Sequence, residues 1–507
     1  MRGKSIMFQG TGSSVGKSML CCAICRIFAQ DGLRVAPFKA QNMALNSFAT
    51  SEGLEMGRAQ VTQAEAAGIE PSVRMNPVLL KPTTDRKSQV IVNGKPLGTM
   101  TAMEYHHYKP QLRALVRETY EALEREVDCV VIEGAGSPAE INLRDGDIVN
   151  MAMAEAADAP VILIGDINLG GVFASLLGTM MLLEPSERRR VRGVIINKFR
   201  GDVKILEPGL KMLEERIGVP VVGVVPWMDI DMEDEDSVTE RFRRTSGEGQ
   251  IQVAIVRLEH ISNFTDFNLL SAEEGVSVRY ASHAHELDGA DIIILPGSKN
   301  TIEDLNVLRR NGMADAIIRH ARSGRLLIGI CGGYQMLGER LLDPLHSESR
   351  VPECAGLGLL PMDVTFNEGK TTVQAAGVID CGEGWLRELN GLALDGYEIH
   401  SGENTFREGC VPFLRLKRRG GQDVDLLDGV CNAQGNVLGS YLHGLFDQGG
   451  FWRAIVNRIR RERGLATEDG EVLTLPQFRE REFNRLADIV RQNVDMDRIY
   501  AILRGEA

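Results

Sequence analysis

Short apolar runs alternate with segments of helical periodicity along the first half of the chain. A run of roughly four to eight apolar residues indicates a buried strand, and apolar residues three or four positions apart indicate an amphipathic helix. We expect strands at residues 5–9, 33–38, 128–133, 160–166, 191–197 and 219–225. We expect helices near residues 17–29, 54–67, 110–126, 148–157, 171–183 and 204–217. This alternation predicts an α/β fold with a mostly parallel, doubly wound sheet.

A charged stretch separates this pattern from a second one. Residues 227–250 are polar and lack apolar periodicity, so we interpret them as a linker between domains. Apolar runs resume at residues 251–256, 291–295 and 326–330 and reach residues 437–443, which predicts a second α/β domain. The predicted organisation is an N-terminal domain at 1–226, the linker at 227–250, a C-terminal domain at 251–447 and a charged helical extension at 448–507.

Composition narrows the classes of protein that need to be considered. The chain has 507 residues, 43% of them hydrophobic and 25% charged, which is ordinary for a globular enzyme. Its net charge of −13 argues against a general nucleic-acid surface. No apolar run is long enough to span a bilayer, the N-terminus lacks the layout of a signal peptide, and the nine cysteines are scattered. We therefore expect a cytoplasmic protein in a reducing environment that binds neither membrane nor nucleic acid.

The segment 325–338 (RLLIGICGGYQMLG) carries the clearest chemical signal. An apolar run ends at Cys331, which has Gly329 before it and Gly332 and Gly333 after it, and a helical pattern follows. A strand, a sharp turn and a helix hold a nucleophile away from the backbone and leave the next N–H free to bind an oxyanion. Because such turns are strained, small neighbours are needed. The segment predicts chemistry at the thiol of Cys331.

A second chemical motif follows the first predicted strand. Residues 9–18 (QGTGSSVGKS) join that strand to a helix and end in the Gly-Lys-Ser of a phosphate-binding loop. The usual pattern has glycine where this chain has Thr11, and the loop resembles the variant found in dethiobiotin-synthetase-like proteins. We expect Lys17 to reach the β- and γ-phosphates of ATP and Ser18 to ligate Mg²⁺. The nucleotide-binding residues expected in this loop are Gly10, Thr11, Gly12, Ser13, Val15, Gly16, Lys17 and Ser18.

Two further strand ends are expected near the phosphates, because α/β sheets bind ligands at the carboxyl ends of their strands. Glu133 ends the predicted strand 128–133 and is placed to act as a second Mg²⁺ ligand or to hold a water molecule. Asn197 ends the predicted strand 191–197 and would contact the nucleotide base. A strand-end turn with no ligand is the alternative interpretation of Asn197.

Residues 37–47 (PFKAQNMALNS) extend the argument to a known family. Together with the variant phosphate loop, the EGAG segment at 133–136 and an amidotransferase-like C-terminal domain, this run closely resembles the cobyric acid synthase family. The resemblance implies ATP- and glutamine-dependent amidation of a corrinoid, with Mg²⁺ accompanying ATP. Adenosylcobyrinic acid a,c-diamide would gain amides at its b, d, e and g carboxylates through acyl phosphates, to give adenosylcobyric acid in cobalamin biosynthesis.

The same run has a physical rationale at the edge of the sheet. It follows a predicted parallel strand, so we expect it beside the phosphates. Lys39 would neutralise a carboxylate or a phosphate, and the side chains expected to bind substrate also include Gln41, Asn42 and Asn46. Without the family resemblance, a polar loop between a strand and a helix would be the simpler interpretation.

The C-terminal domain also resembles class I glutamine amidotransferases. The resemblance implies that Cys331 attacks the carboxamide of glutamine and that His443 takes and returns the proton. The N–H groups of Gly332 and Gly297 would bind the oxyanion. Many of these enzymes orient the histidine with a glutamate two residues later, where this chain has Leu445. We therefore expect a Cys–His dyad with a weakly oriented histidine.

Several points stay open at this stage. His400 is either structural or lines the route of glutamine or ammonia, and Cys22 and Cys25 are interpreted as packing residues because no second pair stands at metal-binding spacing. Two other functions are a related amidoligase, such as a cobyrinic acid a,c-diamide synthase or one acting on a cell-wall precursor, and a non-catalytic P-loop ATPase switch. The sequence leaves open the order of amidations, the corrinoid contacts, the ammonia route and assembly into a homo-oligomer.

Overall fold

The chain folds into two compact units. The computed structural model describes residues 3–84, 87–228, 230, 249–349, 351–382, 386–470 and 472–506. The first unit comprises residues 1–44, 56–235 and 479–507, and the second comprises residues 45–55 and 236–478. Of the predicted linker 227–250, residues 229 and 231–248 lie outside the described residues. No helix in the described ranges is long and apolar enough to cross a membrane.

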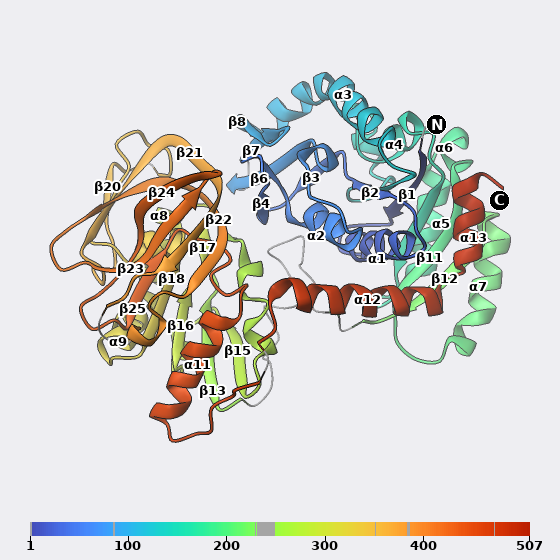
Figure 1. Cartoon of the computed structure of the whole chain (residues 1–507). Helices are drawn as coiled ribbons and strands as arrows, with labels where there is room; N and C mark the ends of the chain where they lie inside the picture. The colour runs from blue at the N-terminus through green and yellow to red at the C-terminus, as the bar shows by residue number, and fades with distance from the viewer. Residues whose placement is uncertain are drawn as a thin grey trace. The chain divides into compact units, whose positions relative to one another are not determined.

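The first unit is built on a parallel sheet with the strand order β12-β11-β10-β1-β9-β2. Figure 1 labels β1, β2, β11 and β12 of this sheet. Its strands are β1 (Lys4–Gly10), β2 (Val35–Phe38), β9 (Cys129–Glu133), β10 (Val161–Asp166), β11 (Val191–Phe199) and β12 (Val221–Pro226). Each strand predicted from the apolar runs is present. Most of their residues are buried, as expected when helices cover both faces of a parallel sheet.

Helices connect these strands, and most of them pack against the sheet. They are α1 (Lys17–Gln30), α2 (Arg58–Ala66), α3 (Ala102–Glu124), α4 (Met151–Ala156), α5 (Val172–Leu182), α6 (Pro185–Arg188) and α7 (Val203–Ile217). Helix α3 begins before its predicted start because Thr101 and Glu104 form a capping box. The Glu104 N–H donates to the Thr101 hydroxyl at 3.3 Å, and the Thr101 N–H donates to the Glu104 carboxylate at 2.7 Å.

A small sheet between β2 and α3 was not predicted. It has the order β3-β6-β7-β8, from β3 (Gln41–Met43), β6 (Val78–Thr84), β7 (Lys87–Val92) and β8 (Lys95–Thr101). Asn93 and Gly94, both with positive φ, make the turn from β7 to β8, as an Asn-Gly hairpin requires. Two short strands, β4 (Ser47–Ala49) and β5 (Glu55–Gly57), pair with each other.

The second unit has a parallel centre and a long antiparallel extension. Its parallel strands are β13 (Ile251–Val256), β15 (Val276–Ala281), β16 (Ile292–Leu295), β18 (Leu326–Ile330) and β25 (Val437–Ser440). The extension contains β21 (Met362–Ile379), β22 (Ala393–Phe406), β23 (Val411–Arg419) and β24 (Gln422–Cys431), with the short β19 (Arg340–Leu342) and β20 (Glu353–Ala355).

Helices and two short strands complete the second unit. The helices are α8 (Thr301–Arg310), α9 (Met313–Arg322), α10 (Gly332–Met336) and α11 (Gly450–Glu462). Strand β14 (Ile261–Ser262) pairs with β17 (Gly297–Ser298). This pairing lies at the carboxyl edge of the parallel strands, because β17 follows β16 and β14 follows β13 in the chain.

The predicted C-terminal extension is helical, and its last part returns to the first unit. It contains α12 (Leu475–Asn493) and α13 (Met496–Arg504), and residues 479–507 belong to the first unit. Phe483, Leu486 and Ile499 share one buried cluster with apolar residues of α1 and of the parallel sheet. The extension therefore contributes to the core of the first unit.

Candidate active sites

The phosphate-loop motif joins β1 to α1, as predicted. Gly16 has a φ of 97°, and a Cβ there would lie 2.1 Å from the Asn197 side-chain nitrogen, so only glycine fits. The Lys17 ammonium donates to the carbonyl of Gly12 at 2.8 Å and to that of Gly136 at 3.1 Å. These carbonyls hold the cation at the mouth of the loop, where a phosphate could take their place.

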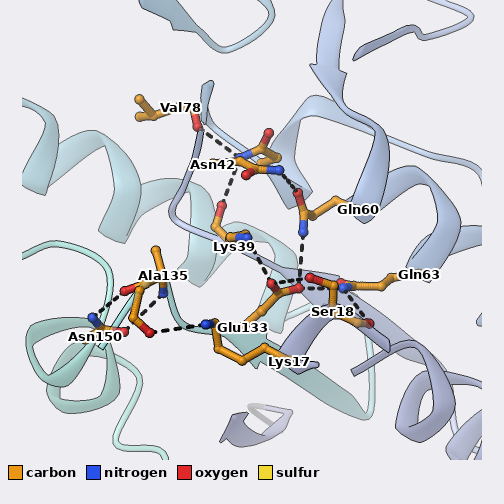
Figure 2. Close-up of polar contacts among 12 residues, drawn as sticks. Lys17, Ser18, Lys39, Asn42, Gln60, Gln63, Val78, Glu133, Ala135 and Asn150 are labelled. Atoms are coloured by element: carbon orange, nitrogen blue, oxygen red, sulfur yellow. Dashed lines mark hydrogen bonds and ion pairs between the residues drawn. The ribbon is translucent and has the colours of Figure 1, made fainter. Parts of the chain in front are cut away.

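Glu133 is the centre of a buried polar cluster beside this loop (Figure 2). The Ser18 hydroxyl donates to Oε1 at 2.8 Å, and the Lys39 ammonium forms an ion pair with the same oxygen at 2.9 Å. The Gln63 amide donates to Oε2 at 2.6 Å, and that of Gln60 lies 3.5 Å from it. Strands β1 and β9 are neighbours in the sheet, which is why Glu133 and Ser18 meet.

The donor set fits magnesium bound mainly through a nucleotide. Mg²⁺ in such sites takes one or two protein oxygens and completes its shell with phosphate oxygens and water. Ser18 and Glu133 supply two adjacent oxygens, while the described residues contain no cluster of three His, Cys, Asp or Glu side chains that could hold a metal ion. Because Lys39 and Gln63 already occupy the Glu133 carboxylate, a metal ligated by Glu133 would compete with them for it.

The remaining residues predicted for this site separate into two groups. Asn197 is buried, and its amide donates to the loop carbonyl of Val15 at 2.9 Å. Gln41 accepts a hydrogen bond from Tyr105 at 2.6 Å, and the Asn42 amide donates to Gln60 at 2.9 Å. Asn46 is buried and belongs to the second unit, whereas the other residues of this group belong to the first.

Three polar residues of the first unit lie in or near this site but were not predicted from the sequence. Gln60 and Gln63 face Glu133 from α2, where an i, i+3 spacing places both on one face of the helix. Asp166 ends β10 and forms an ion pair with Lys198 at 2.8 Å. The strand-end position of Asp166 was a readable signal of the same kind as that of Glu133.

Cys331 occupies the strained turn that the sequence predicted. It lies between β18 and α10 with φ 51° and ψ −111°, a conformation that non-glycine residues rarely adopt. A Cβ at Gly333 would lie 2.1 Å from the Leu295 carbonyl oxygen, and one at Gly332 would lie 2.7 Å from the Ser298 nitrogen. The glycines therefore allow α10 to pack closely against the chain that leaves β16. The Cys331 thiol donates to the carbonyl of Ile399 at 3.4 Å.

His443 lies three residues beyond β25, which is paired with β18, so both catalytic candidates emerge from neighbouring strand ends. Its Nδ1 lies 2.7 Å from a carboxylate oxygen of Asp266, in the turn that follows β14. The expectation of a weakly oriented dyad is therefore wrong. Leu445 is buried in the core, and Asp266 reaches the imidazole from a segment far away in the sequence.

The environment of His443 favours its charged form. Burial alone lowers the pKa of this imidazole, but the Asp266 carboxylate and a hydrogen bond with Cys331 outweigh that effect and raise the pKa to about 10. Asp266 holds Nδ1, which leaves Nε2 available to the thiol. The arrangement is suited to a thiolate–imidazolium pair, the reactive form of a cysteine nucleophile.

Two other side chains contact the His443 ring. Tyr397 stacks on it with a centroid distance of 5.1 Å and an interplanar angle of 14°, and the two residues exchange backbone hydrogen bonds. The Asn263 amide nitrogen lies 3.3 Å from Nε2 and 3.5 Å from Nδ1. These nearly equal distances mean that the amide lies against the ring rather than end-on to one nitrogen. Neither residue was predicted, because both are distant from His443 in the sequence.

The two glycines predicted to bind an oxyanion lie beside these residues. Gly332 follows Cys331, and a Cβ added to it would contact Ser298, the neighbour of Gly297. A Cβ at Gly297 would lie 3.4 Å from Cε1 of His443. Both glycines therefore lie close to the candidate nucleophile and its base, and oxyanion binding by their N–H groups stays a prediction.

His400 has structural partners. Its ring stacks on Tyr441 at 3.8 Å, and its Nδ1 lies 2.8 Å from the carbonyl of Gly402. Its other ring nitrogen lies 3.5 Å from Glu398, which also pairs with Arg419. Cys22 and Cys25 are buried on α1, in agreement with their interpretation as packing residues.

Comparison with known proteins places both units in described families. Residues 6–237 match the CobQ/CobB/MinD/ParA nucleotide binding domain, and residues 252–451 match the CobB/CobQ-like glutamine amidotransferase domain. The chain is 56% identical to a cobyric acid synthase from Alkaliphilus metalliredigens, over 99% of this chain and 100% of that protein. It is 51% identical to one from Photorhabdus laumondii and 50% identical to one from Thermoanaerobacter sp., over at least 98% of each chain. The chain therefore belongs to the cobyric acid synthase family.

Proposed function

We propose that this chain uses ATP and glutamine to amidate the b, d, e and g carboxylates of adenosylcobyrinic acid a,c-diamide, giving adenosylcobyric acid. The observation that carries the proposal is the presence of two chemically different sites on one chain. One is the buried arrangement of Cys331, His443 and Asp266, and the other is the phosphate loop beside Glu133. The full-length similarity to cobyric acid synthases supports this substrate class.

Glutamine would be hydrolysed at the thiol. The Cys331 thiolate attacks the carboxamide carbon, and the N–H groups of Gly332 and Gly297 bind the oxyanion that forms. The His443 imidazolium gives its proton to the departing nitrogen, so ammonia leaves and a thioester remains. His443, now neutral, takes a proton from water as that water attacks the thioester and releases glutamate.

The ammonia would be consumed at the phosphate loop. The γ-phosphoryl group of ATP passes to a corrinoid carboxylate, and ammonia then displaces phosphate from the acyl phosphate to leave an amide. Lys17 stabilises the transferred phosphoryl group and Lys39 holds Glu133 in place. Ser18 and Glu133 would hold magnesium together with phosphate oxygens, and the metal would supply charge neutralisation.

The substitution Cys331→Ala separates the two half-reactions. We expect it to abolish amidation with glutamine while amidation with excess ammonium stays near the wild-type rate, measured by mass spectrometry of the corrinoid product. Cys354→Ala, at a partly exposed cysteine of the same unit, is the matched control and should change neither rate. Loss of both activities in a folded Cys331→Ala protein would contradict the two-site scheme.

A related amidoligase acting on the a and c carboxylates is the main alternative. Turnover of purified enzyme on cobyrinic acid and on its a,c-diamide separates the two functions. The proposed function predicts turnover of the diamide with the gain of four amides, whereas the alternative predicts turnover of cobyrinic acid with the gain of two.

A further inference from the structure

Residues 45–55 lie between two parts of the first unit in the sequence but fold as part of the second. They form a tight hairpin in which the Thr50 N–H donates to the Leu54 carbonyl at 2.8 Å. The side chains of Ser47, Ala49, Thr50 and Glu55 are each at most 1% exposed. A segment buried to this degree is an integral element of the unit and not a surface loop.

Polar contacts fix this hairpin in one position. Glu55 is buried and forms an ion pair with Lys370 of β21. The Gln374 amide, also on β21, donates to the Ala49 carbonyl. A buried carboxylate is costly without its partner, so the Glu55 pair specifies where the segment can dock.

The hairpin packs on residues that contact both catalytic candidates. Phe48 and Ala49 form a small apolar cluster with Tyr397 and Ile399 of β22, and the Phe48 ring lies edge-on to Tyr397 with a centroid distance of 5.2 Å. Tyr397 stacks on His443, and the Ile399 carbonyl accepts the hydrogen bond of the Cys331 thiol. A displacement of Phe48 would therefore change the packing around Tyr397 and Ile399, and with it the positions of His443 and Cys331.

A second route runs from the hairpin to the same imidazole. The Ser47 N–H donates to the side-chain oxygen of Asn263 at 3.3 Å. This bond fixes the oxygen on the Ser47 side and turns the amide nitrogen of Asn263 toward the His443 ring. Asn263 has a φ of 51°, so its backbone is also held in a sparsely populated conformation.

Both ends of the hairpin continue into residues that hold Glu133. Lys39 precedes it and pairs with Oε1, and Gln60 and Gln63 follow it and face Oε2. A metal ion bound with the nucleotide at the phosphate loop would compete with Lys39 and Gln63 for this carboxylate. A ligand can shift a conformational equilibrium only through such a difference in contacts, and here the difference falls on the chain segments that flank the hairpin.

We propose that residues 45–55 position His443 and Cys331 for glutamine hydrolysis and make that hydrolysis respond to the occupancy of the ATP site. Phe48 and Ser47 are the positioning residues, acting through Tyr397 and Asn263. This inference rests on the proposed function, since it assigns the segment a role in coupling the two half-reactions. It accounts for the burial of the segment in a unit other than the one that surrounds it in the sequence.

The test compares Phe48→Ala with Phe48→Tyr and with Glu52→Ala, a control at an exposed position of the same hairpin. Glutamate release is measured with glutamine alone and after addition of ATP and the a,c-diamide. Alkylation of Cys331 by iodoacetamide is followed under the same conditions. In the wild type and in Glu52→Ala we expect ATP and the diamide to raise the rate of glutamate release and to change the rate of alkylation.

In Phe48→Ala we expect kcat for glutamate release to fall by about tenfold or more, with a smaller change in KM, because small displacements of catalytic groups carry costs of this size. The response to ATP and the diamide should be lost, Phe48→Tyr should restore it, and amidation with ammonium should stay near wild type. A wild-type response in Phe48→Ala would overturn the inference, as would a wild-type enzyme whose glutamate release ignores these ligands. Failure of the proposed function is distinct, because the wild type would then make no amide from glutamine.

Discussion

His443 is a buried residue whose surroundings stabilise its protonated form. Burial alone would favour the neutral imidazole, yet Asp266 and Cys331 raise its pKa to about 10. The side chain has neighbours on several sides, with Asp266 at Nδ1, Tyr397 on a face of the ring and the Asn263 amide within 3.5 Å of both ring nitrogens. Orientation and charge are thus set together, which is what a cysteine nucleophile needs from its base.

Replacing Asp266 with asparagine should weaken both functions of this environment. Without the carboxylate the pKa of His443 falls toward its ordinary value of 6.5, so the imidazolium is lost at lower pH. We expect kcat for glutamine hydrolysis to fall by about 100-fold or more, by comparison with the orienting carboxylate of serine proteases. The alkaline limb of the kcat/KM profile should move to lower pH. An unchanged profile would mean that Asp266 does not set the charge of His443.

The same pair makes a pH-dependent contribution to stability. The folded-state pKa of His443 is raised above 6.5, so the stabilisation is fully present below pH 6.5 and is lost as the pH rises through about 10. The difference in thermal midpoint between the wild type and Asp266→Asn should therefore be largest at low pH and shrink toward pH 10. A difference that grew with pH would contradict this assignment.

At the scale of elements, the amidotransferase site depends on close backbone packing between β22 and the loop after β25. A Cβ at Gly396 would lie 1.9 Å from the carbonyl oxygen of His443. The backbone bonds between Tyr397 and His443 exist because this glycine lets the strand approach. The site therefore requires glycine at position 396, because any side chain there would displace the backbone of His443.

Gly396→Ala should disrupt glutamine use while sparing the first unit. The new methyl group forces the His443 loop away from β22, so we expect glutamate release to fall by about 100-fold, the loss typical of an ångström-scale misplacement. Amidation with ammonium should continue. Gly382→Ala is the control, because a Cβ there meets nothing within 4 Å and its backbone is not in the left-handed region. Equal activity of the two variants would show that the approach of Gly396 is not needed.

Elements with strong local patterns were the ones that the sequence could predict. The parallel strands of the first unit and the turn at Cys331 follow from apolar runs and glycine spacing. The small sheet of β3, β6, β7 and β8 was missed because β3 has only three residues and β8 is mostly exposed and lacks an apolar run. Asp266 was missed for another reason, since only the packing of β14 against β17 brings its turn to His443.

At the scale of the whole molecule, neither unit is one continuous stretch of the chain. Residues 45–55 leave the first unit for the second, and residues 479–507 return to the first. The sequence-based division at 226, 250 and 447 assumed that each domain is continuous. Apolar residues of the C-terminal helices fill the core of the nucleotide-binding unit, and no local pattern shows which core an amphipathic helix will join.

The central claim is that ammonia released at Cys331 becomes the amides made at the ATP site. The most direct test supplies amide-¹⁵N glutamine, ATP and adenosylcobyrinic acid a,c-diamide, and counts the labelled nitrogens in the corrinoid by mass spectrometry. We predict four labelled amides in the product of the wild type and none in that of Cys331→Ala supplied with unlabelled ammonium. A wild-type product without label, or label retained in Cys331→Ala, would contradict the account.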